Sequence, residues 1–270
     1  MSKDNGTIMI VNAPVDTRVS LAHLHVRKIA PADLKEVLAK GLDDFMAMPT
    51  YSVFLIVIYP VVGLILLRLT FGYSLLPIVF PLIAGFALLG PFAAIGLYEM
   101  SRRREQRLVA SWSALDVFRM HRIRSIAILG AVLMSIFLAW LSMAMHIYES
   151  IFGNWMPATF TEFVLQVFTT PAGNTLIIVG CGVGFLFAVV AFAISAVSFP
   201  LLVDCDAGVV LAVSTSIRAV AANPVTMALW GLIVVSALAV GFLPFLIGLS
   251  IVLPVLGHST WHLYRKVVER

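Results

Sequence analysis

Long runs of apolar residues, each near the length needed to cross a lipid bilayer, constrain this chain more than any other feature. A helix that crosses ~30 Å of hydrocarbon needs about 20 residues. Apolar side chains make up 61% of the 270 residues and charged side chains only 12%, and the mean hydropathy is +1.02. Soluble domains carry roughly 25% charged residues. The composition therefore excludes a soluble enzyme, a disordered chain and a classical nucleic-acid-binding module, and it predicts a polytopic membrane protein.

The apolar runs predict an all-α bundle of about six transmembrane helices. The last run, 225–264, is too long for one crossing and short for two, but Gly241 and Pro244 near its middle suit a tight turn. Residues 1–30 lack a clear period and are expected to form an irregular tail, whereas 31–270 form one transmembrane domain. The predicted spans are about 52–69, 75–98, 126–145, 175–203, 225–241 and 245–264.

The distribution of basic residues predicts how these spans are oriented. Seven arginines lie in Met100–Arg124, six Lys or Arg residues precede Thr50, and the loop 146–174 has none. Because basic loops stay in the cytoplasm, both termini and the arginine-rich loop are expected there, which requires an even number of spans. Arg68 is the exception, near the outer end of the first span, where it either reaches the headgroups or pairs inside the bundle.

Three amphipathic segments each precede a pair of predicted spans. They are Asp33–Met48, Trp112–Arg124 and Asp206–Asn223, and we expect each to form a cytoplasmic helix in the membrane interface. In the first, Leu34, Val37, Leu38, Leu42 and Phe45 share the apolar face, and Lys35, Glu36, Lys40, Asp43 and Asp44 take the other. In the third, the apolar face holds Val209, Val210, Val213, Ile217 and Val220.

Asp206 suits the N-cap of the third amphipathic helix, where its carboxylate would accept backbone N–H bonds. Asp204, two residues earlier, opens an alternative in which the two carboxylates together attract a divalent cation. Arg218 is the basic residue of this segment.

Two histidines are the candidates for a cofactor or metal site. His258 and His262 lie four residues apart on one helix face, near the cytoplasmic end of the last span, a spacing that can hold a metal ion or help to hold haem. A structural role at the interface fits them as well, because no acidic residue stands between them. The sequence therefore predicts no cofactor or metal, and no grouping of Ser, His and Asp in a recognisable catalytic order.

A local ion pair is expected at the inner end of the second span. Glu99 precedes Arg102 and Arg103 by three and four residues, the spacing at which helical side chains meet. The cluster of Arg102, Arg103, Arg104 and Arg107 either fixes topology and contacts lipid or docks an acidic partner.

Small residues and prolines mark two further features of the spans. Gly180 and Gly184 form a small-xxx-small face that suits close helix packing. Pro91 and Pro254 occupy corresponding positions in a weak repeat with an offset of 163 residues. Interrupted helices in corresponding positions are typical of transporter pathways.

Three stretches carry a resemblance to a known family. They are Gly96–Arg103, Pro200–Pro224 and Leu253–Arg265. Together they resemble the "domain of unknown function 2189" family of bacterial integral membrane proteins, over roughly Ala30 to the C-terminus. The resemblance implies a bacterial inner-membrane location and about six spans, and it implies no activity.

The leading functional hypothesis is a non-enzymatic accessory or scaffolding subunit of a membrane complex, with a respiratory complex as one candidate. Its expected partners are membrane lipids and other membrane subunits, and no nucleic acid. A carrier or permease for an apolar or lipid-like solute is the alternative, because the proline-interrupted spans would line its path. A haem- or metal-binding membrane protein that uses His258 and His262 is the second alternative.

Overall fold

The computed structural model describes residues 24–48, 68, 76–87, 90–108, 123–243 and 248–269, and nearly all of them are helical. The described elements are β1 (His25–Val26), α1 (Asp33–Ala47), η2 (Leu76–Ile78), α3 (Val79–Phe86), α4 (Gly90–Ala93), α5 (Ile95–Glu105), α6 (Ile123–Phe152), α7 (Phe160–Thr169), α8 (Pro171–Ser195), α9 (Ser198–Asp204), α10 (Gly208–Ala222), α11 (Pro224–Phe242), α12 (Leu249–Val267) and β2 (Val268–Glu269).

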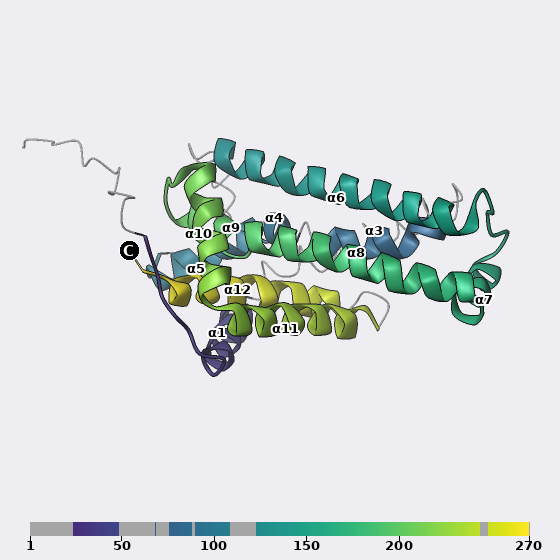
Figure 1. Ribbon diagram of the computed structural model, residues 1–270. Helices are drawn as coiled ribbons and strands as arrows, with labels where there is room; N and C mark the ends of the chain where they lie inside the picture. Colours follow the sequence, from purple (N-terminus) through teal and green to yellow (C-terminus); the bar gives the residue numbers. More distant parts are fainter. Residues whose placement is uncertain are drawn as a thin grey trace, which may run out of the picture.

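Within these ranges, three helical segments are long and apolar enough to cross a membrane. They are α6, the run from Pro171 to Asp204 that joins α8 to α9, and α11. Prolines occupy the first helical position of α8 and α11, where their missing N–H group has no intrahelical partner to lose. These segments coincide with the predicted third, fourth and fifth spans. Helix α6 packs against α8, and α11 packs against α12 (Figure 1).

The second predicted span is not one continuous helix. Over 75–98 the chain forms η2, α3, α4 and the start of α5, which follow one another along the length of the bundle (Figure 1). Proline rings remove a backbone donor and clash with the preceding turn. Pro91 is the second residue of the four-residue α4, and Ala94 separates α4 from α5. Pro254, by contrast, lies inside an unbroken α12.

The six-span count remains a prediction. The first predicted span lies outside the described residues apart from Arg68, whose side chain is exposed. The sixth predicted span, 245–264, largely overlaps α12. The first half of α12 is apolar, and its last turns contact charged side chains of α1 and α5.

Two of the three amphipathic segments form helices, α1 and α10, and α10 lies across the ends of the long helices (Figure 1). Most of the remaining amphipathic segment, Trp112–Arg124, lies outside the described residues, which resume at residue 123. The buried faces differ from those predicted. In α10, Ala212, Thr215, Ser216 and Ala219 are buried, whereas Val210 is 85% exposed.

Helix α1 likewise buries Asp44, which we had placed on the polar face, and leaves Leu42 exposed. The reason is spacing: Leu34, Val37, Gly41 and Asp44 form one stripe at intervals of three and four residues.

Part of the predicted irregular tail is ordered against the far end of the chain. β1 pairs antiparallel with β2, with His25 opposite Glu269 and Val26 opposite Val268. Asn223 reinforces the attachment, because its side chain accepts from the Ile29 N–H at 2.7 Å and donates to the Arg27 carbonyl at 3.0 Å.

Buried side chains concentrate toward the end of the bundle where α5, α9, α10 and α12 meet (Figure 1). Farther along, Trp140 joins three helices: its Nε1 donates to the Pro81 carbonyl at 2.9 Å, and its ring covers Gly184. A side chain at Gly184 would meet the ring at 2.8 Å. Gly180 has no described atom within 4 Å of such a position, so only one of the two predicted packing glycines is covered within the described structure.

Candidate functional site

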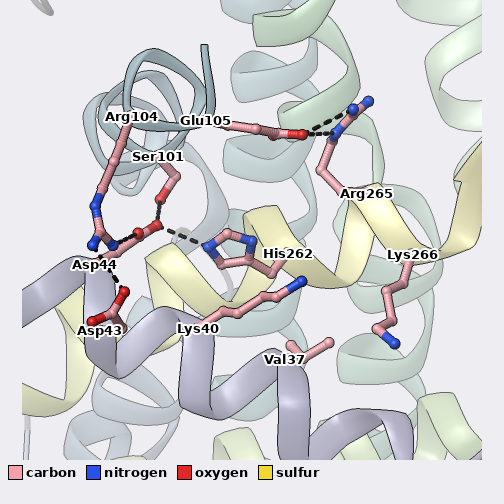
Figure 2. Close-up of a pocket in the computed structure, with 10 residues that line it drawn as sticks. All are labelled: Val37, Lys40, Asp43, Asp44, Ser101, Arg104, Glu105, His262, Arg265 and Lys266. Carbon is pink, nitrogen blue, oxygen red and sulfur yellow. Dashed lines mark hydrogen bonds and ion pairs between the residues drawn. The ribbon is translucent and has the colours of Figure 1, made fainter. Parts of the chain in front are cut away.

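A polar cavity of about 510 Å³ lies where α1, α5 and α12 meet (Figure 2). Ten residues line it: Val37, Lys40, Asp43, Asp44, Ser101, Arg104, Glu105, His262, Arg265 and Lys266. Two close approaches bring the helices together. Gly41 of α1 lies against the backbone of Ser259, and Gly257 of α12 lies against Leu97.

Asp44 is the centre of this site, since its carboxylate is buried and receives donors from two other helices (Figure 2). From α5, the Ser101 hydroxyl donates to Oδ2 at 2.5 Å and Arg104 donates to Oδ1. From α12, His262 Nε2 donates to Oδ2 at 2.8 Å. Burial alone would raise the pKa of Asp44, but the hydrogen bonds from His262, Ser101 and Arg104 outweigh burial and lower the pKa to about 2. Asp44 is therefore a carboxylate at neutral pH.

His258 extends the hydrogen-bonded chain into the core. It is fully buried, and its Nδ1 lies 2.8 Å from the Ser101 hydroxyl. The ionised Asp44 can only accept, so Ser101 gives its single proton to Asp44 and must itself accept from His258 Nδ1–H. Nε2 of a neutral His258 is then a lone pair, and this atom is buried with no hydrogen-bond partner among the described residues.

The direction of these bonds matters for chemistry. In a serine hydrolase, the hydroxyl gives its proton to an imidazole that an acid orients. Here the Ser101 hydroxyl points its proton at a carboxylate and is itself 1% exposed. The arrangement brings Ser, His and Asp together, which the sequence order had not suggested, but its polarity suits helix attachment rather than nucleophilic attack.

A second ion-pair network borders the cavity. Arg265 binds Glu105 at 2.9–3.0 Å, and the Trp261 indole donates to the same carboxylate at 3.1 Å. The Tyr264 hydroxyl donates to the buried Asp204 at 2.6 Å. These contacts join α5, α9 and α12 at their charged ends.

Lys266 attaches the start of α1 to the end of α12. Its ammonium lies 3.0 Å from Asp33 and 2.6 Å from Glu36, and Glu36 also pairs with Lys40 at 2.8 Å. Bonds from Lys266 and Lys40 lower the pKa of Glu36 to about 2. The acidic and basic side chains around the cavity are therefore largely paired with one another.

The structure uses the candidate histidines differently from a metal or haem site. His258 binds Ser101 and His262 binds Asp44, so the two rings are directed to different protein partners. Asp44, Ser101 and Arg104 were missed as site residues because they lie 57 to 218 residues from their partners in the chain. One signal was available: the acidic Asp44 continues the buried stripe of α1.

The predicted ion pair at Glu99 is present. The fully buried Glu99 carboxylate binds Arg102 at 2.7 Å and Arg103 at 2.8 Å. The next arginine, Arg104, pairs instead with Asp43 and Asp44 of α1.

The predicted cap at Asp206 is wrong. Asp206 is exposed, and the residue before α10 is Ala207, which makes no side-chain capping bond. Gly208 at the helix start has a φ of +68°, and this turn shifts the N-terminus past Asp206. Asp204 is buried against Tyr264, and Arg218 contacts Thr215 of its own helix at 3.2 Å.

Comparison with known families bears on the middle of the chain. Residues 79–204 match the family described as "Predicted integral membrane protein (DUF2189)". The resemblance to DUF2189 is thereby confirmed over this segment, which runs from α3 to α9 and includes Gly96–Arg103. The stretch Leu253–Arg265 lies beyond the DUF2189 match, as does most of Pro200–Pro224. No curated protein and no solved structure matches the chain. The chain is thus an integral membrane protein whose activity the DUF2189 description leaves open.

Proposed function

We propose that the protein is a non-enzymatic accessory or scaffolding subunit of a bacterial inner-membrane complex, and that α8 packs against a helix of a partner subunit. One observation carries the proposal: only 6% of the apolar window in the Pro171–Asp204 segment is buried within the chain, against 28% for α6 and 22% for α11. A central apolar helix that gains so little from its own chain has most of its surface available for a neighbour.

The surface of α8 suits a helical neighbour. Gly180 and Gly182 have open space above their backbone, and exposed Phe185 and Leu186 follow them. Without a hydrophobic driving force between helices in lipid, small residues allow the close backbone approach on which helix association depends. The described polar cluster supports the non-enzymatic part, because Ser101, Asp44 and His262 are engaged with one another.

The test is gentle extraction of the tagged protein from its native membrane, followed by mass spectrometry of everything that co-purifies. We expect stoichiometric recovery of at least one other membrane protein with the wild type. Gly180→Leu should lose that partner, because a bulky side chain blocks close approach. Gly231→Leu is the matched control, since Gly231 lies on α11 with equally open space around it. Recovery of the wild type alone would contradict the proposal.

A carrier for an apolar or lipid-like solute is the second candidate, and the broken path from η2 to α5 favours it. Discontinuous helices in membranes occur where backbone lines a cavity or pathway. Vesicles that contain the protein and a fluorescent phosphatidylglycerol in one leaflet provide a direct assay of lipid transfer.

Transfer above that of protein-free vesicles is expected if this candidate is right, with a several-fold loss in Pro91→Ala and in Pro254→Ala. Pro171→Ala is the control, because Pro171 only begins a helix. Transfer equal to that of empty vesicles, or full activity in both variants, would exclude the kinked pathway.

A further inference from the structure

We propose that His262, Asp44, Ser101 and His258 form a latch that holds α1 on α5 and α12, and that protonation of the buried His258 releases α1 on acidification. The hydrogen-bonded chain His262–Asp44–Ser101–His258 passes through all three helices. It begins at the cavity wall and ends in the core (Figure 2 shows its first three members). Two of its three bonds fix α1 to a neighbour, and the third, between Ser101 and His258, joins α5 to α12. A change in its proton count therefore changes the attachment of α1.

In the closed latch, the neutral His258 has no favourable position for a second proton. Ser101 gives its proton to Asp44, so His258 Nδ1 donates and Nε2 carries the lone pair. A proton added at Nε2 would create a buried cationic N–H group at an atom that has no hydrogen-bond partner among the described residues. The Leu97 backbone favours the protonated ring, but burial acts against it more strongly. Burying a charged group is costly unless the structure rearranges. Opening the contact between α1 and α12 would give that N–H group access to water.

His262 supplies the other end of the latch. Its side chain is 16% exposed at the cavity, and its Nε2 donates to Asp44. The proposed proton-sensitive member is His258, which is fully buried.

Charged groups from each neighbouring helix act on His258. From α1, Asp44 favours the protonated ring, whereas Arg104 of α5 and a charged His262 of α12 disfavour it. The carboxylate of α9, Asp204, is engaged with Tyr264 and Arg265, and α11 contains no titratable side chain. Because Asp44 is already compensated by Arg104 and His262, its attraction does not cancel the cost of burying a second cation.

The test is hydrogen–deuterium exchange of α1 in the full-length protein reconstituted in nanodiscs, measured from pH 7.5 to 5.0 and corrected for intrinsic exchange. We expect the exchange of residues 33–47 in the wild type to rise at least tenfold on acidification, while α6 stays protected. His258→Asn keeps a side-chain donor toward Ser101 but does not titrate, so its α1 should stay protected at pH 5.0.

Two controls separate this latch from general acid sensitivity. His146→Asn removes a histidine on α6 and should leave the acid response unchanged. His262→Gln retains a donor toward Asp44 and should keep the response of His258. An unchanged α1 in the wild type at pH 5.0 would overturn the proposal without any variant, and so would a full acid response in His258→Asn.

Discussion

The Asp44 carboxylate of α1 accepts hydrogen bonds from α5 and α12, and so a single residue joins the three helices of the site. Three donors from α5 and α12 surround it, and its side chain is 5% exposed. Its neighbour Asp43 also contacts Arg104, but from a side chain that is 70% exposed. The two aspartates differ mainly in burial, which makes them a matched pair.

Asp44→Ala should destabilise the protein by about 3 kcal/mol, because it leaves the Ser101 and His262 donors without their acceptor in a buried site. Asp43→Ala should cost at most about 0.5 kcal/mol, as expected for an exposed ion pair. Reversible unfolding in mixed detergent micelles measures both. Equal losses in the two variants would show that burial does not set the strength of the cluster.

The pH dependence of stability should report the lowered pKa of Asp44. A carboxyl whose folded pKa lies below its unfolded value stabilises the protein above the unfolded pKa, and this contribution is lost as pH falls through the folded pKa. With the pKa lowered from 3.8 to about 2, at most about 2 kcal/mol should be lost between about pH 4 and pH 2. Thermal unfolding of the wild type and of Asp44→Asn over this range measures it, and the variant should lack that part of the slope.

Local contacts could be predicted at this scale and distant ones could not. Glu99 and its two arginines are three and four residues apart on one helix, so helix geometry alone brings them together. The partners of Asp44 come from helices whose relative placement no local pattern specifies. Asp206 was misplaced for another reason: the helix begins at Gly208, which has a positive φ, so that the N-cap is Ala207, one residue later than predicted.

The position of helix α1 depends on a residue without a side chain, Gly41. Gly41 lies so close to α12 that a Cβ would stand 2.7 Å from the Ser259 backbone nitrogen and 2.8 Å from its Cα. The absence of a side chain therefore lets Asp44, one turn later, reach Ser101 and His262. The amphipathic pattern predicted this helix nearly to the residue, but it could not show that a neighbouring helix, as well as the membrane, covers one face.

Gly41→Ala should separate α1 from α12. Alanine favours helix by about 1 kcal/mol, but the clash with backbone atoms should outweigh that gain and leave a net loss of about 1–3 kcal/mol. Gly96→Ala is the control, because no described atom lies within 4 Å of its added methyl group. Limited proteolysis and unfolding of the two variants provide the comparison, and a more stable Gly41→Ala would contradict the close packing.

For the whole molecule, the paired strands constrain the number of membrane crossings. β1 precedes and β2 follows every apolar helix, and the two lie in one sheet, so both are on the same side of the membrane. Three crossings would separate them. If α6, α8–α9 and α11 all cross the membrane, at least one more crossing is needed, and the segments 75–98 and 249–264 and the apolar run 52–69 are available for it. The charge pattern also predicts an even count, which stays a prediction.

Reporter fusions test this arrangement. Alkaline phosphatase or green fluorescent protein fused after Arg107 and at the C-terminus should report the cytoplasm, and a fusion after Glu162 should report the opposite side. A C-terminal fusion on the outer side would contradict both the even number of crossings and the strand pairing.

The contact between the two ends of the chain also has a consequence for biosynthesis. Residues 25–47 leave the ribosome before any span is inserted, but their partners, β2 and α12, are made only after all intervening helices. The buried stripe of α1 therefore has no α12 to pack against until translation has passed residue 269. A prematurely terminated or incompletely inserted chain would leave that stripe accessible to chaperones and membrane proteases. Closure of the sheet thus marks a chain that has been synthesised and inserted through its last helix.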